Sequence, residues 1–176
     1  MKTTTKIIAS AVAAVALFFT TNVNAQSPKL GIGLNAGIPT TNGYNFALGG
    51  DLRFQFDVSK QVSIPVTAGY TNFFGKKDYF APGVDMPSAG YIPVKAGVKV
   101  FFDETGSGFY GMGELGAAIG VSNNAKTGFL YSPAIGYSWS NGLDLGLKYE
   151  GIAKGTKIGP ENINQVALRI AYGFKL

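Results

Sequence analysis

The sequence predicts an all-β protein: an eight-stranded antiparallel transmembrane β-barrel, preceded by a cleavable signal peptide. Eight segments of the chain alternate apolar residues with small or polar ones, and a strand points successive side chains to opposite faces. Charged residues make up only 14% of the chain, whereas aromatics reach 13% and glycine 25 of 176 residues. Ordinary soluble domains carry about 25% charged residues, so this composition favours a wall that faces lipid.

Positions 1–25 are predicted to be the signal peptide and positions 26–176 the barrel domain. Lys2 and Lys6 form a basic region, and a short apolar stretch and the small residue Ala25 follow, as in secretory signals. A membrane-anchor helix is the alternative. The apolar stretch is shorter than the roughly 20 residues that such a helix needs.

The composition also excludes several kinds of chemistry. The chain has no Cys and no His, which removes disulfides, thiol chemistry and the commonest general base and metal ligand. After the N-terminus there is no apolar run of about 18 residues that would form a spanning helix. Loss of Lys2 and Lys6 lowers the formal charge from +5 to +3. This charge is too small to indicate nucleic acid, and no cofactor is expected.

The first half of the chain contains four predicted strands, each about ten to fourteen residues long, as expected for tilted membrane strands. In the first, Leu30, Ile32 and Leu34 lie on one face, with glycines between them. An Asn-Gly pair at 42–43 marks the first turn. The predicted ranges are 29–38, 44–58, 62–74 and 91–102.

The second half contains four more predicted strands. Asn141-Gly142 is a strong two-residue hairpin signal between two of them. In the last strand, Val166 to Leu176 alternate large apolar residues with small or charged ones. This strand is expected to pair with the first and close the barrel. The predicted ranges are 109–121, 128–140, 143–152 and 165–176.

The connections also alternate. Those after the second, fourth and sixth predicted strands are short, those after the third and seventh are long, and those after the first and fifth are intermediate. Outer-membrane barrels have short periplasmic turns and longer external loops. Pro65, Pro93 and Pro133 fall inside predicted strands, where each lacks an N–H for the ladder, so bulges or strand ends are expected there.

The apolar face is predicted to face lipid. The opposite face is mostly Gly, Ala, Ser and Thr, which suits the crowded interior of an eight-stranded barrel better than a water-exposed surface. Large aromatics near the strand ends are typical of interfacial girdles. A secreted soluble barrel, apolar within, is the alternative. The predicted girdle comprises Tyr44, Phe54, Phe56, Phe74, Phe102, Phe109, Phe129, Trp139, Tyr149, Tyr172 and Phe174.

The export segment, the eight alternating segments and the stretch from Val166 to Leu176 resemble the small outer-membrane barrel family, the OmpA transmembrane domain and OmpX type. The resemblance covers the whole mature chain. It implies location in the outer membrane and a final strand read by the barrel-insertion machinery, with Tyr172, Phe174 and Leu176 as its signal. The family commonly ends in Phe or Trp instead of Leu. Its enzymatic members rely on His, which this chain lacks.

Charged residues on the polar face are expected to line the lumen, where unpaired charge is very costly. Mixed signs predict a salt-bridge network that fills the barrel, although a narrow ion pathway would use the same residues. The acidic pairs Asp51/Asp57 and Asp144/Glu150 lie about 20 Å apart along their strands, too far for a catalytic dyad. The predicted network comprises Asp51, Arg53, Lys95, Lys99, Glu114, Asp144, Lys148, Glu150 and Arg169, with Asp57 and Lys175 on the same face.

The predicted external loops carry five lysines. They could contact phosphates of lipopolysaccharide, or simply be solvated. These residues are Lys76, Lys77, Lys126, Lys154 and Lys157. The sequence therefore predicts a non-enzymatic, monomeric outer-membrane protein with a filled polar lumen and a structural or surface-interaction role. A narrow ion or small-solute channel and a secreted ligand-binding barrel are the alternatives.

Overall fold

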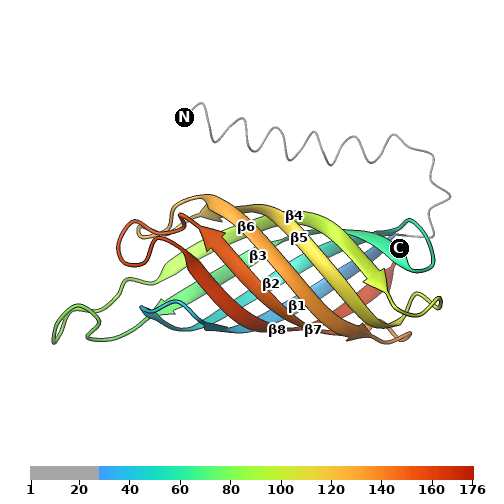
Figure 1. Cartoon of the computed structure of the whole chain (residues 1–176), viewed down its shortest axis with the longest axis horizontal. Helices are drawn as coiled ribbons and strands as arrows, with labels where there is room; N and C mark the ends of the chain where they lie inside the picture. Colours follow the sequence, from blue (N-terminus) through green and yellow to red (C-terminus); the bar gives the residue numbers. More distant parts are fainter. Residues whose placement is uncertain (1–27) are drawn as a thin grey trace, which may run out of the picture.

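A computed structural model describes residues 28–176, and its eight strands form one closed antiparallel barrel (Figure 1). The strands are β1 (Lys29–Pro39), β2 (Tyr44–Asp57), β3 (Val62–Gly75), β4 (Ala89–Phe101), β5 (Gly108–Gly120), β6 (Gly128–Ser138), β7 (Leu143–Ala153) and β8 (Ile163–Lys175). The predicted eight-stranded antiparallel fold is confirmed, and every boundary lies within two residues of its prediction. The predicted signal peptide lies outside the described residues.

β8 closes the barrel against β1, as the alternation predicts. The two strands pair from Lys29 opposite Lys175 to Pro39 opposite Gln165, without a register shift. The Leu176 N–H donates to the Pro28 carbonyl at 2.9 Å just beyond this ladder. Within residues 28–176, no helix is long and apolar enough to cross a membrane.

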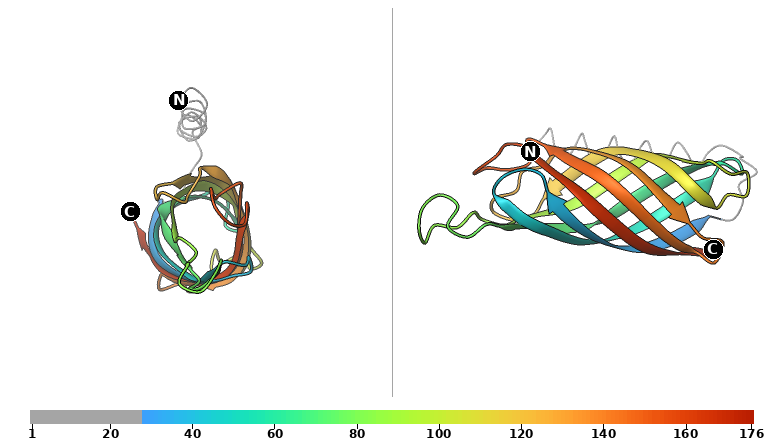
Figure 2. Two further views of the ribbon diagram at one scale, coloured as in Figure 1. Left: turned by 90° about the vertical axis from the view of Figure 1, so that its left-hand side faces the viewer. Right: turned by 60° about the horizontal axis from the view of Figure 1, so that its bottom comes forward.

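The two ends of the barrel differ. One end, called the terminal end, holds Pro28, Leu176 and the three short turns at 58–61, 102–107 and 139–142. The opposite end, called the loop end, holds the connections that follow β1, β3, β5 and β7, of which 76–88 projects farthest (Figure 1). Figure 2 looks along the barrel from the loop end and also shows the tilt of the strands across the wall.

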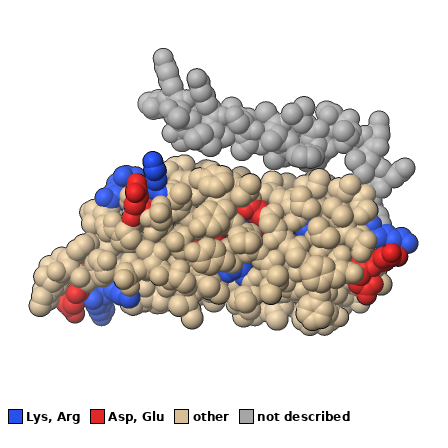
Figure 3. Space-filling view, viewed as in Figure 1, with Lys and Arg blue, Asp and Glu red and all other residues tan. Residues whose placement is uncertain are grey.

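The large apolar side chains point outward and the polar ones inward. Leu34 is 72% exposed, whereas its neighbour Asn35 is buried in the lumen. The same alternation runs along all eight strands, and the charged groups visible in Figure 3 gather at the two ends of an otherwise nearly uncharged wall. This orientation is the reverse of a soluble ligand-binding barrel, whose apolar face is internal.

Tyr44 is an exception, because its predicted place in the outer girdle is wrong. The register between β2 and β3 shifts between Tyr44 and Phe46, which marks a β-bulge. A bulge adds one residue to a strand and reverses the side on which the preceding residue lies. Tyr44 is therefore buried in the lumen against Phe73, while Phe46 stays outside and stacks on Phe74.

The prediction of bulges or strand ends at the three prolines is also wrong. Pro65 and Pro93 lie inside β3 and β4, and the pairs on both sides of each proline keep one register. Pro133 lies inside β6 and interrupts only the ladder with β7. Each proline leaves a gap in one ladder and remains paired on the other side. The neighbouring pairs therefore hold the register without the missing N–H.

At the loop end the lumen is apolar. A cluster of large buried side chains, called the apolar plug, fills this end, and Met86 from the 76–88 loop packs into it. Asn124 ties three loops to the plug, because its amide donates to Tyr44 Oη and the Pro87 carbonyl and accepts from the Ile158 N–H. The plug comprises Tyr44, Ala47, Phe73, Met86, Ala89, Tyr91, Ala118, Ala125, Leu130, Ile152 and Ile163.

Candidate functional site

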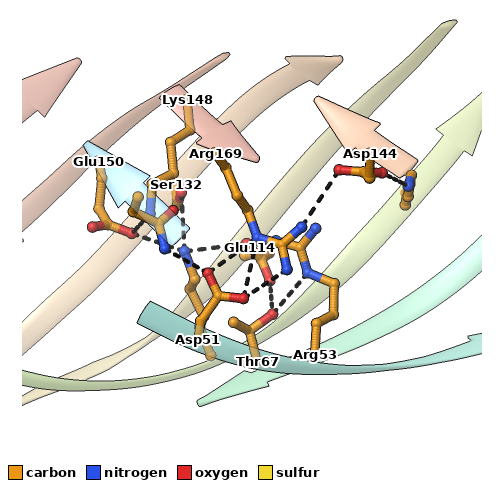
Figure 4. A network of polar contacts seen from close by, with 12 residues as sticks. Asp51, Arg53, Thr67, Glu114, Ser132, Asp144, Lys148, Glu150 and Arg169 are labelled. Atoms are coloured by element: carbon orange, nitrogen blue, oxygen red, sulfur yellow. Dashed lines mark hydrogen bonds and ion pairs between the residues drawn. The ribbon is translucent and has the colours of Figure 1, made fainter. Parts of the chain in front are cut away.

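Nine charged side chains meet in the middle of the lumen (Figure 4) and are called the charge network. They come from five strands, because every second residue of each strand points inward. All nine are buried, and they comprise five cations and four anions. The network consists of Asp51, Arg53, Lys95, Lys99, Glu114, Asp144, Lys148, Glu150 and Arg169.

Arg169 on β8 binds Asp51 on β2 across the intervening strand β1. Its Nη2 lies 2.6 Å from Asp51 Oδ1, and its Nε lies 3.0 Å from Oδ2. The Asn35 amide donates a further hydrogen bond of 2.7 Å to the same carboxylate. Gly33 leaves room for the guanidinium, since a Cβ there would lie 2.7 Å from Arg169 Nη2. The interaction therefore links the closing strand to the second strand.

Asp144 connects Arg169 to Lys99. Its Oδ1 accepts from Arg169 Nη1 at 3.4 Å and from Tyr110 Oη at 2.9 Å, and its Oδ2 lies 2.8 Å from Lys99 Nζ. The Lys99 ammonium also lies 3.8 Å from the centre of the Tyr110 ring. A desolvated ammonium over an aromatic face is stabilised by the ring quadrupole.

Glu114 on β5 is buried between two cations. Its Oε2 lies 3.2 Å from Lys95 Nζ and 3.4 Å from Arg53 Nη2. Its Oε1 accepts a 2.6 Å hydrogen bond from the Thr67 hydroxyl, which in turn accepts from Arg53 Nε. Thr67 thereby links Arg53 and Glu114 by a second route.

Glu150 on β7 is the other carboxylate bound by Lys95. Lys95 Nζ lies 2.8 Å from Glu150 Oε2, and Lys148 Nζ lies 3.2 Å from the same oxygen. Gln165 donates to Oε1 at 3.0 Å, and Ser132 lies within hydrogen-bond distance of Lys95 Nζ. Every carboxylate of the network therefore contacts at least one cation, as an ion pair in the interior of a protein requires.

The structure brings together all nine predicted lumen residues, but through contacts across the lumen that alternation does not specify. Asp57, also predicted on this face, lies outside the charge network and forms an ion pair of 2.8 Å with Lys29. The hydrogen-bonding partners Asn35, Thr67 and Tyr110 did not stand out as site residues in the sequence. The one feature of the sequence that could have identified them is that each lies on the inward face of its strand.

A cavity of about 1100 Å³, called the terminal cavity, opens at the terminal end of the barrel. Its inner wall includes Arg53, Lys99, Asp144 and Arg169 from the charge network. Its outer wall is formed by the short turns of that end, with Lys175 at the end of β8. The lumen thus has three zones: the apolar plug, the charge network and the terminal cavity.

The five predicted loop lysines all lie at the loop end, opposite the terminal cavity. Lys76 is half-buried, and the others are exposed. Lys126 and Lys157 lie on adjoining loops, because the Lys126 N–H donates to Gly155 and the Lys157 N–H donates to Asn124. Among the described residues, none of the five forms an ion pair, and no group of three or more potential metal ligands occurs in positions 28–176.

No protein-family model and no curated protein matches the sequence. Solved structures do match. Ail of Yersinia pestis, in complex with the heparin analogue sucrose octasulfate, is 17% identical, with a TM-score of 0.55 over 84% of this chain and 98% of that one. The N-terminal barrel domain of Pseudomonas aeruginosa OprF is 12% identical, with a TM-score of 0.54 over 86% and 100%. Neisserial surface protein A is 16% identical, with a TM-score of 0.53 over 86% and 99%.

The fold is that of the small eight-stranded outer-membrane barrels. The match includes 98–100% of each of these three proteins, so the likeness concerns the whole barrel. At 12–17% sequence identity, the likeness shows that the fold is shared and nothing more. The interior of this barrel is therefore interpreted from its own residues.

Proposed function

We propose that this protein is a non-enzymatic integral outer-membrane protein whose closed barrel has a structural or surface-interaction role. The observation that carries the proposal is the combination of an apolar outer wall with a buried charge network. Exposed apolar area on a water-soluble protein rarely exceeds a few hundred Å² in one patch. Here outward aliphatic and aromatic side chains surround the barrel, as lipid contact requires.

The proposed orientation places the loop end outside the cell and the terminal end in the periplasm. Its support is the difference in connection lengths, because outer-membrane barrels have short periplasmic turns. In this orientation, Tyr172, Phe174 and Leu176 lie at the periplasmic end, where the insertion machinery would act on the last strand. Export would depend on the predicted signal peptide at 1–25.

Two zones of the lumen, the apolar plug and the charge network, support the proposal that the lumen is closed. The apolar plug fills the loop end with side chains such as Phe73 and Tyr91, which are almost completely buried. Behind it, Glu114 and Lys99 are equally inaccessible. An ion crossing the barrel would have to displace both zones, so a channel is the less favoured function. The hydroxyls of Ser63 and Thr67 do donate to Asp57 and Glu114, but each of these carboxylates is held in an ion pair, which makes it a poor general base.

The membrane location is tested by cell fractionation followed by gel electrophoresis with and without heating. We expect the protein in the outer-membrane fraction, resistant to extraction by carbonate, with a compact unheated form that migrates differently from the heated form. Recovery of the folded protein in detergent-free buffer would contradict the proposal and support a secreted barrel.

Lumen closure is tested by the conductance of the purified protein in planar bilayers. We expect no stable single-channel steps at neutral pH. Reproducible steps that disappear in Arg53→Ala or Lys99→Ala would establish an ion pathway along the network. Steps that persist unchanged in those variants would indicate a contaminating pore, which a preparation from cells lacking the protein would reveal.

We also propose that the loop lysines contact phosphates of lipopolysaccharide in the outer leaflet. Lys77, Lys126, Lys154 and Lys157 are exposed at the proposed external end and carry no ion pair with a described residue. Lysine binds phosphate as a point charge. Joint replacement of these four by glutamine should reduce co-purifying lipopolysaccharide, measured by its phosphate content. An unchanged content would show that the loops are merely solvated.

A further inference from the structure

We propose that the terminal cavity is a binding site for a multivalent oxyanion, a small solute that carries clustered phosphate or carboxylate groups. The inference depends on the barrel and its charges and not on a particular role in the envelope. It assigns a ligand class to a cavity that the closed-barrel proposal leaves without one.

The cavity is blind. Its volume of about 1100 Å³ is sufficient for a small organic anion, since ligand sites commonly range from about 300 to 1000 Å³. The charge network forms its inner wall, and the apolar plug closes the barrel beyond that wall. A solute therefore enters and leaves only at the terminal end, between the short turns.

The charged lining is predominantly positive. Six cationic side chains line the cavity, against three acidic ones. A concave site with one dominant sign of charge and low-dielectric walls concentrates ions of the opposite sign. The cations are Lys29, Arg53, Lys60, Lys99, Arg169 and Lys175, and the acids are Asp57, Glu104 and Asp144.

Two of the six cations retain charge that the protein does not neutralise. Lys60 and Lys175 make no ion pair with any described residue, and both are exposed at the mouth. The other four are held in ion pairs, Lys29 with Asp57, Arg53 with Glu114, Lys99 with Asp144 and Arg169 with Asp51. The uncompensated charge of the lining therefore lies at the mouth, on two exposed lysines.

The charge network adds to this imbalance. It contains five cations and four anions, so the network as a whole, most of which lies behind the cavity wall, carries a net charge of +1. The remaining partners at the inner wall are saturated: Arg169 is bound to Asp51 and Asp144, and Lys99 to Asp144. A monovalent ion would neutralise only part of the excess. An anion with two or more charged groups matches the two lysines at the mouth and the net positive charge behind the inner wall.

Oxyanions fit the side chains as well as the charge. The two free cations at the mouth are lysines, and a lysine binds phosphate or carboxylate oxygens as a rotatable point charge. The phosphate and carboxylate classes share this chemistry, so two probes are needed. Pyrophosphate represents the first class and citrate the second.

The test is titration calorimetry on the barrel in phosphatidylcholine nanodiscs, with pyrophosphate or citrate at low ionic strength. The test variant is Lys60→Gln combined with Lys175→Gln, which removes the two unpaired charges at the mouth without disturbing the network. The matched control is Lys60→Arg combined with Lys175→Arg, which keeps both positive charges at the mouth while changing the same two side chains. Fluorescence of the single tryptophan, Trp139, verifies that all three proteins are folded.

We expect one pyrophosphate or citrate to bind per barrel, with affinity falling as salt is added. Loss of the two lysines should weaken binding about tenfold, the effect of two nearby charges at high dielectric, while the control binds as the unaltered protein does. A preference between the probes identifies the ligand class. No saturable binding of either probe, or an equal loss in the control, would overturn the inference and leave the membrane location untouched.

Discussion

Replacement of Arg169 by glutamine should be one of the most destabilising single changes in the lumen. The guanidinium contacts Asp51 through Nε and Nη2 and Asp144 through Nη1, and its side chain is only 5% exposed. Glutamine retains some hydrogen-bonding capacity but no charge. The change therefore leaves two buried carboxylates to their remaining partners.

Those remaining partners determine the magnitude. Asp144 keeps Lys99 at 2.8 Å and the Tyr110 hydroxyl at 2.9 Å, so its loss is modest. Among residues 28–176, Asp51 keeps only the neutral amide of Asn35 as a direct partner. Breaking a buried ion pair by removing one partner costs about 3–5 kcal/mol, and we expect a value in that range from Asp51 alone.

The assay is urea-induced unfolding from lipid vesicles, followed by the fluorescence of Trp139, which is 40% exposed in the 139–142 turn at the terminal end. The double variant with Asp51→Asn and Arg169→Gln removes both charges and should recover about 1–3 kcal/mol relative to the sum of the single changes. Lys77→Gln, on an exposed loop, serves as the control and should change the free energy of unfolding by less than about 0.5 kcal/mol.

The reasoning would be refuted by a loss below about 1 kcal/mol for Arg169→Gln together with additive single changes in the cycle. That outcome would mean that water reaches Asp51 freely in the lumen. It would also weaken the interpretation of the network as a filling for the barrel.

Three further predictions concern the wall, the network and the plug. Gly97→Ala should destabilise the barrel by about 1–3 kcal/mol in the same unfolding assay, because a Cβ there would collide with the Gly113 carbonyl, whereas Gly113→Ala faces open space and should be tolerated. Glu150→Gln should strand the buried ammonium of Lys148, whose one ion pair among the described residues is with Glu150, and added Lys148→Met should restore part of the lost stability. Met86→Ala should speed proteolysis within loop 76–88 without comparable loss of barrel stability, and equal protease resistance would contradict the assigned packing of that loop.

The strands were predictable because each carries its own two-residue period over ten or more positions. Even the closing pairing of β8 with β1 followed from the number of strands and the need to leave no free edge. The bulge beside Tyr44 was not predictable, since one inserted residue leaves no local mark in a polar-aromatic stretch. The prediction of bulges at the prolines was wrong because the hydrogen bond lost at each proline is outweighed by the paired residues around it.

The site was less accessible to sequence reasoning. Alternation places Lys95 and Glu150 in the lumen, but it does not reveal that they meet, because strand stagger and barrel curvature decide which inward side chains face one another. The apolar plug was missed for a different reason. Phe73, Tyr91 and Leu130 occupy the inward face near the loop end, where a polar interior was expected.

The proline gaps have a mechanical consequence. Pro65 and Pro93 both interrupt the ladder between β3 and β4, while Pro133 interrupts the one between β6 and β7. The resistance of the wall to lateral tension therefore differs around its circumference, with weakened seams between β3 and β4 and between β6 and β7. Compression by the surrounding bilayer would flatten the barrel along a fixed direction instead of shrinking it evenly.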